Sequence, residues 1–408
     1  MPMVNREKRW RTIKKFDQKD MRCCTLELAK RYLADFPDHA AIWYRYGRAL
    51  YSVGRHAEAL LALHRAKRLC PLDKLDHVMI QLGYLYQWRG NFRRAEAWYR
   101  KAIRACPSDV DAYIFLGELL VLEGRLVDAE AIYRQGTQCQ QGCINEAFFN
   151  LGLVLRSQGR YSEAVACFRR ALEIDPKYKE AKKEMADVER AIELKRNARP
   201  RSTARARGVS MPGNTRKKQW RTIKRFDLKH MRCCTLELAR RYLSDFPAHT
   251  GTWVRYGRSL YSIGRYTEAL SALRRAKRLC RPKKLHFLRV QFGCLYERRG
   301  NFRRAEAWYR QAILACPSDA DAYIYLGGLL ATEGRLTEAE AIYRQATRCK
   351  QGCVDEAYLN LGLVLRAQER YSEAVACFRR ALEIDPKYKN AKTELADVER
   401  AMELIRNA

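Results

Sequence analysis

Cysteine and histidine are the residue types in this chain that could bind a metal ion or supply a nucleophile. The chain has 15 cysteines and seven histidines. Cys139 and Cys143 form a CxxxC pair that recurs at Cys349 and Cys353. Two thiols are fewer than the four ligands that a structural zinc ion requires, and a free cysteine also packs as a small apolar residue. We therefore interpret both pairs as packing residues and expect no metal.

Catalytic motifs are the next candidates for chemistry. Only His39 and His249 occupy matching positions in the two halves of the chain, and both lie beside a predicted turn. The sequence contains no Ser/His/Asp arrangement, phosphate-cradling loop or metal-protease motif. We expect a protein that is not an enzyme and uses no cofactor.

Basic residues gather near residue 10 and again near residue 220, where they could contact phosphates. Trp10 and Trp220 lie among them and could stack on a base. No recognised nucleic-acid motif accompanies them. Nucleic-acid binding is therefore the alternative function, possible but not favoured. Its possible phosphate contacts are Lys8, Arg9, Arg11, Lys14, Lys15, Lys217, Lys218, Arg221, Lys224 and Arg225.

The net charge of +33 favours acidic partners through long-range attraction. Hydrophobic residues make up 47% of the chain, enough for a buried interior. No segment approaches the roughly 18 apolar residues of a membrane span, and the N-terminal residues lack the apolar stretch of a signal peptide. The cysteines form no dense disulfide framework, which suits a reducing compartment. We expect a soluble, cytoplasmic protein and make no prediction of its oligomeric state.

The elements that would position these residues are duplicated. Residues 1–198 and 211–408 align without gaps, and about 142 of 198 positions are identical. Residues 199–210 join the copies and contain four arginines, a proline and a glycine without apolar periodicity. This composition is typical of a flexible linker. The sequence therefore predicts two similar domains joined by a basic tether.

A shorter repeat of about 34 residues runs through each copy. Large side chains spaced by three and four residues share one helix face, as in Phe148, Leu151 and Leu155. Small residues then allow two helices to approach closely, and a glycine ends the first helix. An aromatic residue of the second helix (Tyr99, Tyr133 or Phe168) fills the interface, and a proline ends this helix. The recurring positions are Trp43, Gly47, Gly54, Ala59, Ala66 and Pro71; Met79, Gly83, Gly90, Ala95, Ala102 and Pro107; and Phe148, Gly152, Gly159, Ala164, Ala171 and Pro176.

This pattern resembles the tetratricopeptide repeat family. The resemblance implies an all-α fold of two right-handed α-solenoids, built from helix-turn-helix repeats and joined by the flexible linker. Glu369 departs from the pattern, because it replaces the turn glycine. The predicted repeats are about 8–39 (degenerate), 40–73, 76–109, 110–143 and 145–178 with a cap at 179–197, then about 218–249 (degenerate), 250–283, 286–319, 320–353 and 355–388 with a cap at 389–407.

The resemblance also implies a concave groove, lined by the first helix of each repeat, that binds peptide segments of other proteins. Only Asn150 and Asn360 fit the pattern by which relatives grip a terminal carboxylate, so that device is incomplete. Ile114, Phe115 and Leu122 are expected to pack between repeats instead. The predicted peptide-binding residues are Tyr44, Arg48, Tyr51, Tyr84, Trp88, Asn150, Arg156, Arg258, Tyr261, Arg298, Asn360 and Arg366.

The copies differ most between residues 71–90 and 281–300, where Tyr84 corresponds to Cys294 and Trp88 to Arg298. One hypothesis is that the copies prefer different ligands, the second copy a more acidic one. Neutral drift of an exposed helix is the alternative. We predict a non-enzymatic protein–protein interaction scaffold that binds peptide segments, some of them acidic. A regulatory subunit of an enzyme encoded elsewhere would have the same sequence features.

Overall fold

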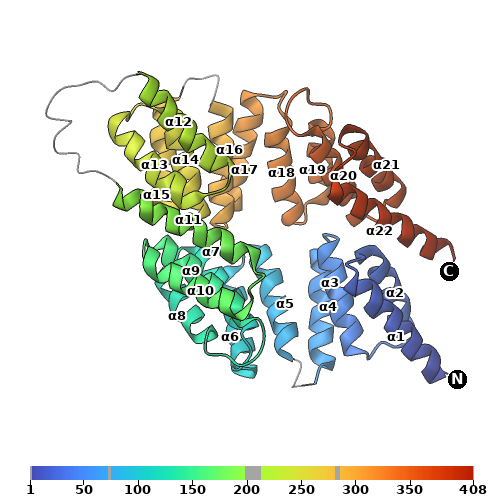
Figure 1. The fold of residues 1–408 in the computed structure, drawn as a ribbon. Helices are drawn as coiled ribbons and strands as arrows, with labels where there is room; N and C mark the ends of the chain where they lie inside the picture. Colours follow the sequence, from blue (N-terminus) through green and yellow to red (C-terminus); the bar gives the residue numbers. More distant parts are fainter. Residues whose placement is uncertain (1, 72–74, 198–212, 281–284, 408) are drawn as a thin grey trace. The chain divides into compact units, whose positions relative to one another are not determined.

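The computed structural model describes residues 2–71, 75–197, 213–280 and 285–407. These residues form 22 helices and two isolated β-bridges, so the predicted all-α fold is confirmed (Figure 1). The predicted linker, 199–210, lies outside the described residues. No helix in the described ranges is both long and apolar enough to cross a membrane.

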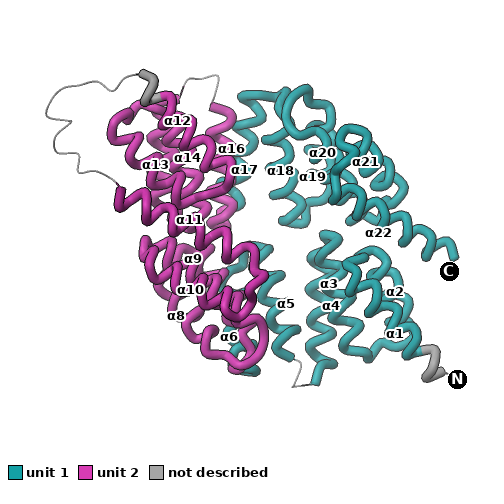
Figure 2. Tube along the Cα trace, in the orientation of Figure 1, with its two compact units in different colours: residues 1–106, 302–408 teal, residues 107–301 magenta. Residues whose placement is uncertain are grey.

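Two compact units divide the chain differently from the two copies. Unit 1 comprises residues 1–106 and 302–408, and unit 2 comprises residues 107–301 (Figure 2). Each unit therefore contains helices from both copies. The predicted division into domains at 1–198 and 211–408 stays a prediction.

Unit 1 is built from twelve helices in the described residues, six from each copy. Their bounds are α1 Pro2–Gln18, α2 Arg22–Asp35, α3 Ala40–Ser52, α4 His56–Leu69, α5 Leu75–Trp88, α6 Phe92–Ala105, α17 Phe302–Ala315, α18 Ala320–Thr332, α19 Leu336–Ala346, α20 Val354–Ala367, α21 Tyr371–Ile384 and α22 Lys389–Arg406.

Unit 2 is built from ten helices in the described residues. Their bounds are α7 Asp111–Glu123, α8 Leu126–Gly136, α9 Ile144–Ser157, α10 Tyr161–Ile174, α11 Lys179–Arg196, α12 Gly213–Leu228, α13 Arg232–Asp245, α14 Thr250–Ser262, α15 Tyr266–Leu279 and α16 Leu285–Arg298.

Within a repeat, the two helices meet where a glycine faces an aromatic ring. A Cβ atom added at Gly152 of α9 would lie 2.6 Å from Cε1 of Phe168 in α10. Phe168 is fully buried, and its counterparts Tyr99 and Tyr133 are 0% and 2% exposed. The predicted roles of the small residue and of the aromatic residue are both confirmed, because only glycine leaves space for a ring at this distance.

The turn between the two helices needs a residue with positive φ. Gly159 has φ of 81°, and the corresponding Glu369 is held at φ of 62°. A residue with a side chain is strained in this left-handed region, whereas glycine is not. The sequence departure at Glu369 therefore changes the energy of this turn and leaves its conformation in place.

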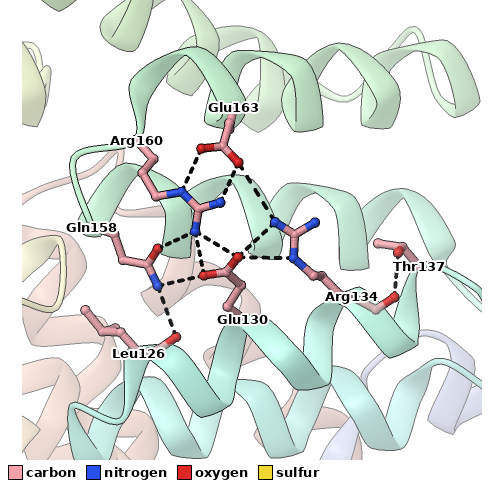
Figure 3. A network of polar contacts seen from close by, with 7 residues as sticks. All are labelled: Leu126, Glu130, Arg134, Thr137, Gln158, Arg160 and Glu163. Carbon is pink, nitrogen blue, oxygen red and sulfur yellow. Dashed lines mark hydrogen bonds and ion pairs between the residues drawn. The ribbon is translucent and has the colours of Figure 1, made fainter.

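Successive repeats are joined by ion pairs on their surface as well as by apolar packing. In unit 2, Glu130 of α8 accepts hydrogen bonds from Arg134 (2.8 Å), Gln158 (2.9 Å) and Arg160 (2.8 Å) (Figure 3). Burial alone would raise the pKa of the Glu130 carboxyl group, but these donors outweigh it and lower the pKa. In unit 1, an equivalent network forms in which Arg370 donates to Glu340 at 2.7 Å. Two equivalent networks thus link α8 to α10 and α19 to α21.

Candidate functional site

A pocket of about 660 Å³ lies within unit 1. Helices α1 to α5 of the first copy provide one part of its wall, and helices α18 to α20 of the second copy provide the other. Six of the predicted peptide-binding residues line it: Arg48, Tyr51, Tyr84, Trp88, Asn360 and Arg366. The structure thus brings together, in one cavity, residues that the sequence assigns to two separate grooves.

Helix periodicity explains how single elements present these side chains. Arg48 and Tyr51 lie one turn apart on α3, and Tyr84 and Trp88 lie one turn apart on α5. Residues three or four positions apart share a helix face. On α5 the opposite face is the packing face, where Leu82 and Leu85 are buried. The side chains that do not pack are therefore the ones that reach the pocket.

Three aromatic rings form a cluster on the pocket wall, which we call the aromatic cluster: Tyr51, Tyr84 and Trp88. The ring centroids of Tyr51 and Tyr84 are 5.3 Å apart, and Trp88 lies 6.1 Å from Tyr51 and 6.2 Å from Tyr84, all edge to face. Trp88 is 40% exposed. Burial, followed by the hydrogen bond with Tyr84, raises the pKa of Tyr51. The cluster offers an apolar surface with a neutral hydroxyl group at pH 7.

Charged side chains of both signs line the same pocket. The Arg22 guanidinium group donates a hydrogen bond to the Asp20 carboxylate at 2.7 Å, and this hydrogen bond raises the pKa of Arg22. Arg48 lies 3.8 Å from Asp17, which also pairs with Arg45. The side chain of Arg48 is 46% exposed. Neighbouring charges thus largely balance one another inside the pocket, and Arg48 is the most accessible cation of these pairs.

Arg156 and Arg366 are placed differently from the other predicted residues. Arg366 is 4% exposed, pairs with Glu394, and donates to the carbonyl oxygen of Ser52 at 3.1 Å. Arg156 is 6% exposed and pairs with Glu184. A buried guanidinium group needs such partners to offset its desolvation. Both arginines connect a first helix to the cap helix, and their burial leaves little of either guanidinium group for a ligand.

The remaining predicted peptide-binding residues of unit 2 occupy varied environments. Arg258 pairs with the buried Asp227, whereas Arg298 is exposed at the end of α16. Tyr261 is half-buried. Asn150 is 9% exposed, and its Nδ2 has no acceptor among the described residues. In unit 1, Tyr44 is half-buried, and Arg48 lies over its ring at 5.9 Å.

The expected packing residues of α7 and its turn are only partly enclosed. Ile114 is buried as expected, while Phe115 and Leu122 are half-buried.

The two histidines at matching positions, His39 and His249, each lie directly before a helix. His39 precedes α3 and packs on Trp10, and His249 accepts a hydrogen bond from the Thr252 N–H at 3.2 Å. Cys139 Sγ lies 3.7 Å from the carbonyl oxygen of Pro107, at the repeat junction, and the fifteen cysteines, all within the described ranges, form no disulfide.

The possible phosphate contacts lie on α1 and α12. Arg9 pairs with Asp35 at 2.6 Å, and Arg11 pairs with Glu7 at 2.6 Å, so acidic groups already meet these two guanidinium groups. The other eight are exposed: Lys8, Lys14, Lys15, Lys217, Lys218, Arg221, Lys224 and Arg225.

Trp10 and Trp220 are both partly buried. Trp10 packs on the cluster that contains Ile13 and Tyr32, with Arg45 over its ring at 5.0 Å. Trp220 packs on Tyr242, with Arg255 over its ring at 4.7 Å. Both rings thus pack against the core of the first helix pair of their copy, and stacking on a base stays a prediction.

Several pocket residues have no sequence signature. Asp17, Asp20, Arg22 and Gln81 line the pocket but belong to no motif. The wall from Ala331 to Ala367 lies about 250 or more positions further along the chain. A repeat period describes contacts between neighbouring repeats, so it carries no information about this approach of two distant segments.

Successive helix pairs that pack side by side define an α-helical repeat protein, an architecture suited to binding other proteins. Models described as tetratricopeptide repeat match residues 26–74, 80–142, 146–178, 236–282, 290–352 and 355–388, which is more than half of the chain. The chain belongs to the tetratricopeptide repeat family.

Relatives match one part of the chain each. Tetratricopeptide repeat protein 7B of Homo sapiens is 31% identical over 136 residues, which are 33% of this chain and 16% of that protein. Protein O-mannosyl-transferase TMTC2 of Homo sapiens is 31% identical over 101 residues, 24% of this chain and 12% of that protein. The chain thus matches less than a fifth of the length of these relatives. The crystal structure of yeast Tom70 is 12% identical and covers 100% of this chain and 90% of its own, with a TM-score of 0.40.

Proposed function

We propose that this chain is a non-enzymatic scaffold that binds an extended peptide segment of another protein in the unit 1 pocket. The observation that carries the proposal is the aromatic cluster of Tyr51, Tyr84 and Trp88 on the pocket wall. Aromatic side chains supply much of the binding energy at protein interfaces, since they bury a large area and lose little rotamer freedom. A partly exposed cluster of this kind suits a bulky apolar side chain of the ligand.

Polar groups around the cluster support a peptide rather than a small apolar ligand. Gln81 and Asn360 line the same pocket, and their amides can donate to and accept from a peptide backbone. In unit 2, the equivalent Asn150 has a buried Nδ2 without an acceptor among the described residues. An unsatisfied buried donor is costly, so a carbonyl group of a ligand would relieve that cost.

The net charge of +33 favours a partner with acidic residues beside its apolar anchor. Arg48 is the exposed cation at the pocket that would meet them. The cysteines of the described ranges form no disulfide, which agrees with a reducing compartment, and we propose the cytoplasm as that compartment.

The second copy supplies the test. Tyr84→Cys with Trp88→Arg gives the pocket the residues of positions 294 and 298 while the fold stays that of the repeat. The matched control is Leu61→Ser, which also introduces the second-copy residue but on an apolar side chain that is 71% exposed outside the pocket. A random peptide library is screened for binding to the full chain. The enriched peptides are then titrated against the wild type and each variant to measure their dissociation constants.

We expect the enriched peptides to share a bulky apolar residue. Their dissociation constants should rise at least about tenfold in the double variant, as for loss of an interface hot spot, and stay within about twofold in the control. Enriched peptides that bind the double variant as well as the wild type would place the binding surface elsewhere and refute the proposal for this pocket.

A further inference from the structure

The same helix-to-helix joint is built twice, once in each unit. In unit 2, the cap helix α11 of the first copy packs against α13 of the second copy. In unit 1, the cap helix α22 of the second copy packs against α2 of the first copy (Figure 2). We call these the cap joints. Because α2 and α13 are equivalent helices, the two cap joints have equivalent partners.

A buried aspartate forms the centre of each cap joint. The carboxylate of Asp187 accepts hydrogen bonds from the backbone N–H groups of Cys233 at 2.8 Å and Cys234 at 3.1 Å. The carboxylate of Asp397 accepts from the N–H groups of Cys23 at 2.9 Å and of Cys24 at 3.5 Å. Asp187 is 2% exposed and Asp397 is 5% exposed.

These bonds satisfy a helix end that has no cap of its own. The first N–H groups of an α-helix lack partners within the helix, and a side chain just before the helix usually accepts from them. Met231 and Met21 occupy that position before α13 and α2, and neither makes a side-chain cap. The negative charge of the aspartate also suits the positive end of the helix dipole. Each helix is thus capped by an aspartate of the other copy.

The C-terminal end of each cap helix accepts a hydrogen bond from an arginine of the partner helix, and the two cap joints are alike in this respect. Arg241 of α13 donates to the carbonyl oxygen of Leu194, and Arg31 of α2 donates to that of Leu404 at 2.8 Å. Carbonyl groups in the last turn of a helix lack partners within the helix, so an arginine there satisfies one of them. Each cap joint therefore has a carboxylate on one helix end and a guanidinium group on the other.

Each copy carries both halves of a cap joint. Its last helix provides the aspartate, and the N-terminal end of its second helix, α2 or α13, is the end that such an aspartate caps. We propose that the two cap joints, and not the linker at 199–210, hold the copies together, so that one repeat array is self-complementary and the chain is a covalently joined dimer of it. The kind of partner that this surface fits is a second copy of the same array. This inference does not depend on the identity of the peptide ligand.

Cutting the linker in the full chain tests the proposal directly. A recognition site for a sequence-specific protease is inserted between residues 199 and 210, the folded protein is cleaved, and its mass is measured by size-exclusion chromatography with light scattering. We expect the two pieces to stay together at micromolar concentration. Pieces that separate under these conditions would show that the linker holds them and would overturn the proposal.

The double variant Asp187→Ala with Asp397→Ala in the same cleavable chain assigns the association to the cap joints. Removing a helix cap typically weakens a helix end by about fivefold or more, so we expect the dissociation constant of the pieces to rise at least about tenfold. Glu193→Ala with Glu403→Ala is the matched control, since it removes the same charge from exposed positions on the same two helices.

Thiol labelling gives a readout that does not need the variants. Cys23, Cys24, Cys233 and Cys234 are buried in the cap joints, whereas Cys143 and Cys353 are exposed. In the cleaved wild type, mass spectrometry should find Cys143 and Cys353 modified and the four joint cysteines protected. Rapid labelling of the joint cysteines at unchanged helix content, or equal affinity of the aspartate and control variants, would refute the role of the cap joints.

Discussion

At the residue scale, neighbouring glycines of α18 face different surroundings. A Cβ atom added at Gly327 would lie 2.6 Å from two ring atoms of Tyr343, a side chain that is only 3% exposed and cannot move aside. A Cβ atom at Gly328 would meet only the Tyr343 hydroxyl oxygen, at 3.6 Å. The first glycine is therefore required by packing, and the second is not.

We predict opposite effects of alanine at these two positions. Gly327→Ala should lower the free energy of unfolding by about 1–3 kcal/mol through overpacking. Gly328→Ala should leave it unchanged or raise it by up to about 1 kcal/mol, because alanine favours a helix interior more than glycine does. Urea unfolding followed by circular dichroism measures both. Equal destabilisation by the two variants would contradict the packing argument.

At the element scale, single carboxylates connect successive repeats. Glu130 is 15% exposed and accepts hydrogen bonds from α8 and from the turn between α9 and α10, while Glu163 is 52% exposed and lies at the rim of the same network (Figure 3). Hydrogen bonds to a charged group stabilise more when the group is shielded from water. Glu130 should therefore contribute more to the contact between α8 and α10 than Glu163 does.

Glu130→Ala should lower the free energy of unfolding at pH 7 by about 1–2 kcal/mol, and Glu163→Ala should have a much smaller effect. The sign of the pH dependence follows from the lowered pKa of Glu130 in the folded state. Its stabilisation is present above the pKa of the unfolded chain, near 4.5, and disappears as the pH falls through the folded value.

The free energies of the wild type and of Glu130→Ala should therefore converge between pH 7 and pH 3. Urea titrations across this range measure the difference. A difference that grows on acidification would show that Glu130 does not act through its charged form.

At the scale of the whole molecule, the net charge of +33 should act on the rate of association rather than on the peptide contacts themselves. Long-range attraction is screened by salt, whereas contacts between buried apolar groups are not. For the proposed peptide ligand, we therefore expect the aromatic cluster and the charge of the chain to act on different kinetic steps.

For an acidic peptide selected on the full chain, raising the salt concentration from 50 to 200 mM should slow association and leave dissociation nearly unchanged. Tyr84→Cys with Trp88→Arg should instead speed dissociation. Stopped-flow fluorescence measures both rates. In a parallel titration with a nucleic acid in place of the peptide, tight binding that weakens near 10³-fold over the same salt range would indicate many phosphate contacts, and thus the nucleic-acid alternative.

Sequence reasoning predicted the features that depend on near neighbours. The helix pairs, the glycine facing an aromatic ring, and the turn at Gly159 all follow from side chains within about 34 positions of one another. Predictions about single groove residues were less complete. Arg366 has the type and spacing of a ligand contact, but its buried pairing with Glu394 depends on how the cap helix packs.

Helix periodicity and close packing are local and recur in every repeat, so the amino-acid sequence is sufficient to identify a duplicated tetratricopeptide repeat array. Which helices share a unit is visible in the folded chain alone. The pocket joins α3 and α5 to α18 and α20, and Asp397 caps a helix that lies 374 positions earlier. Nothing local specifies such contacts, since they depend on the sum of many small rotations between repeats and on the complementary helix ends that those rotations bring together.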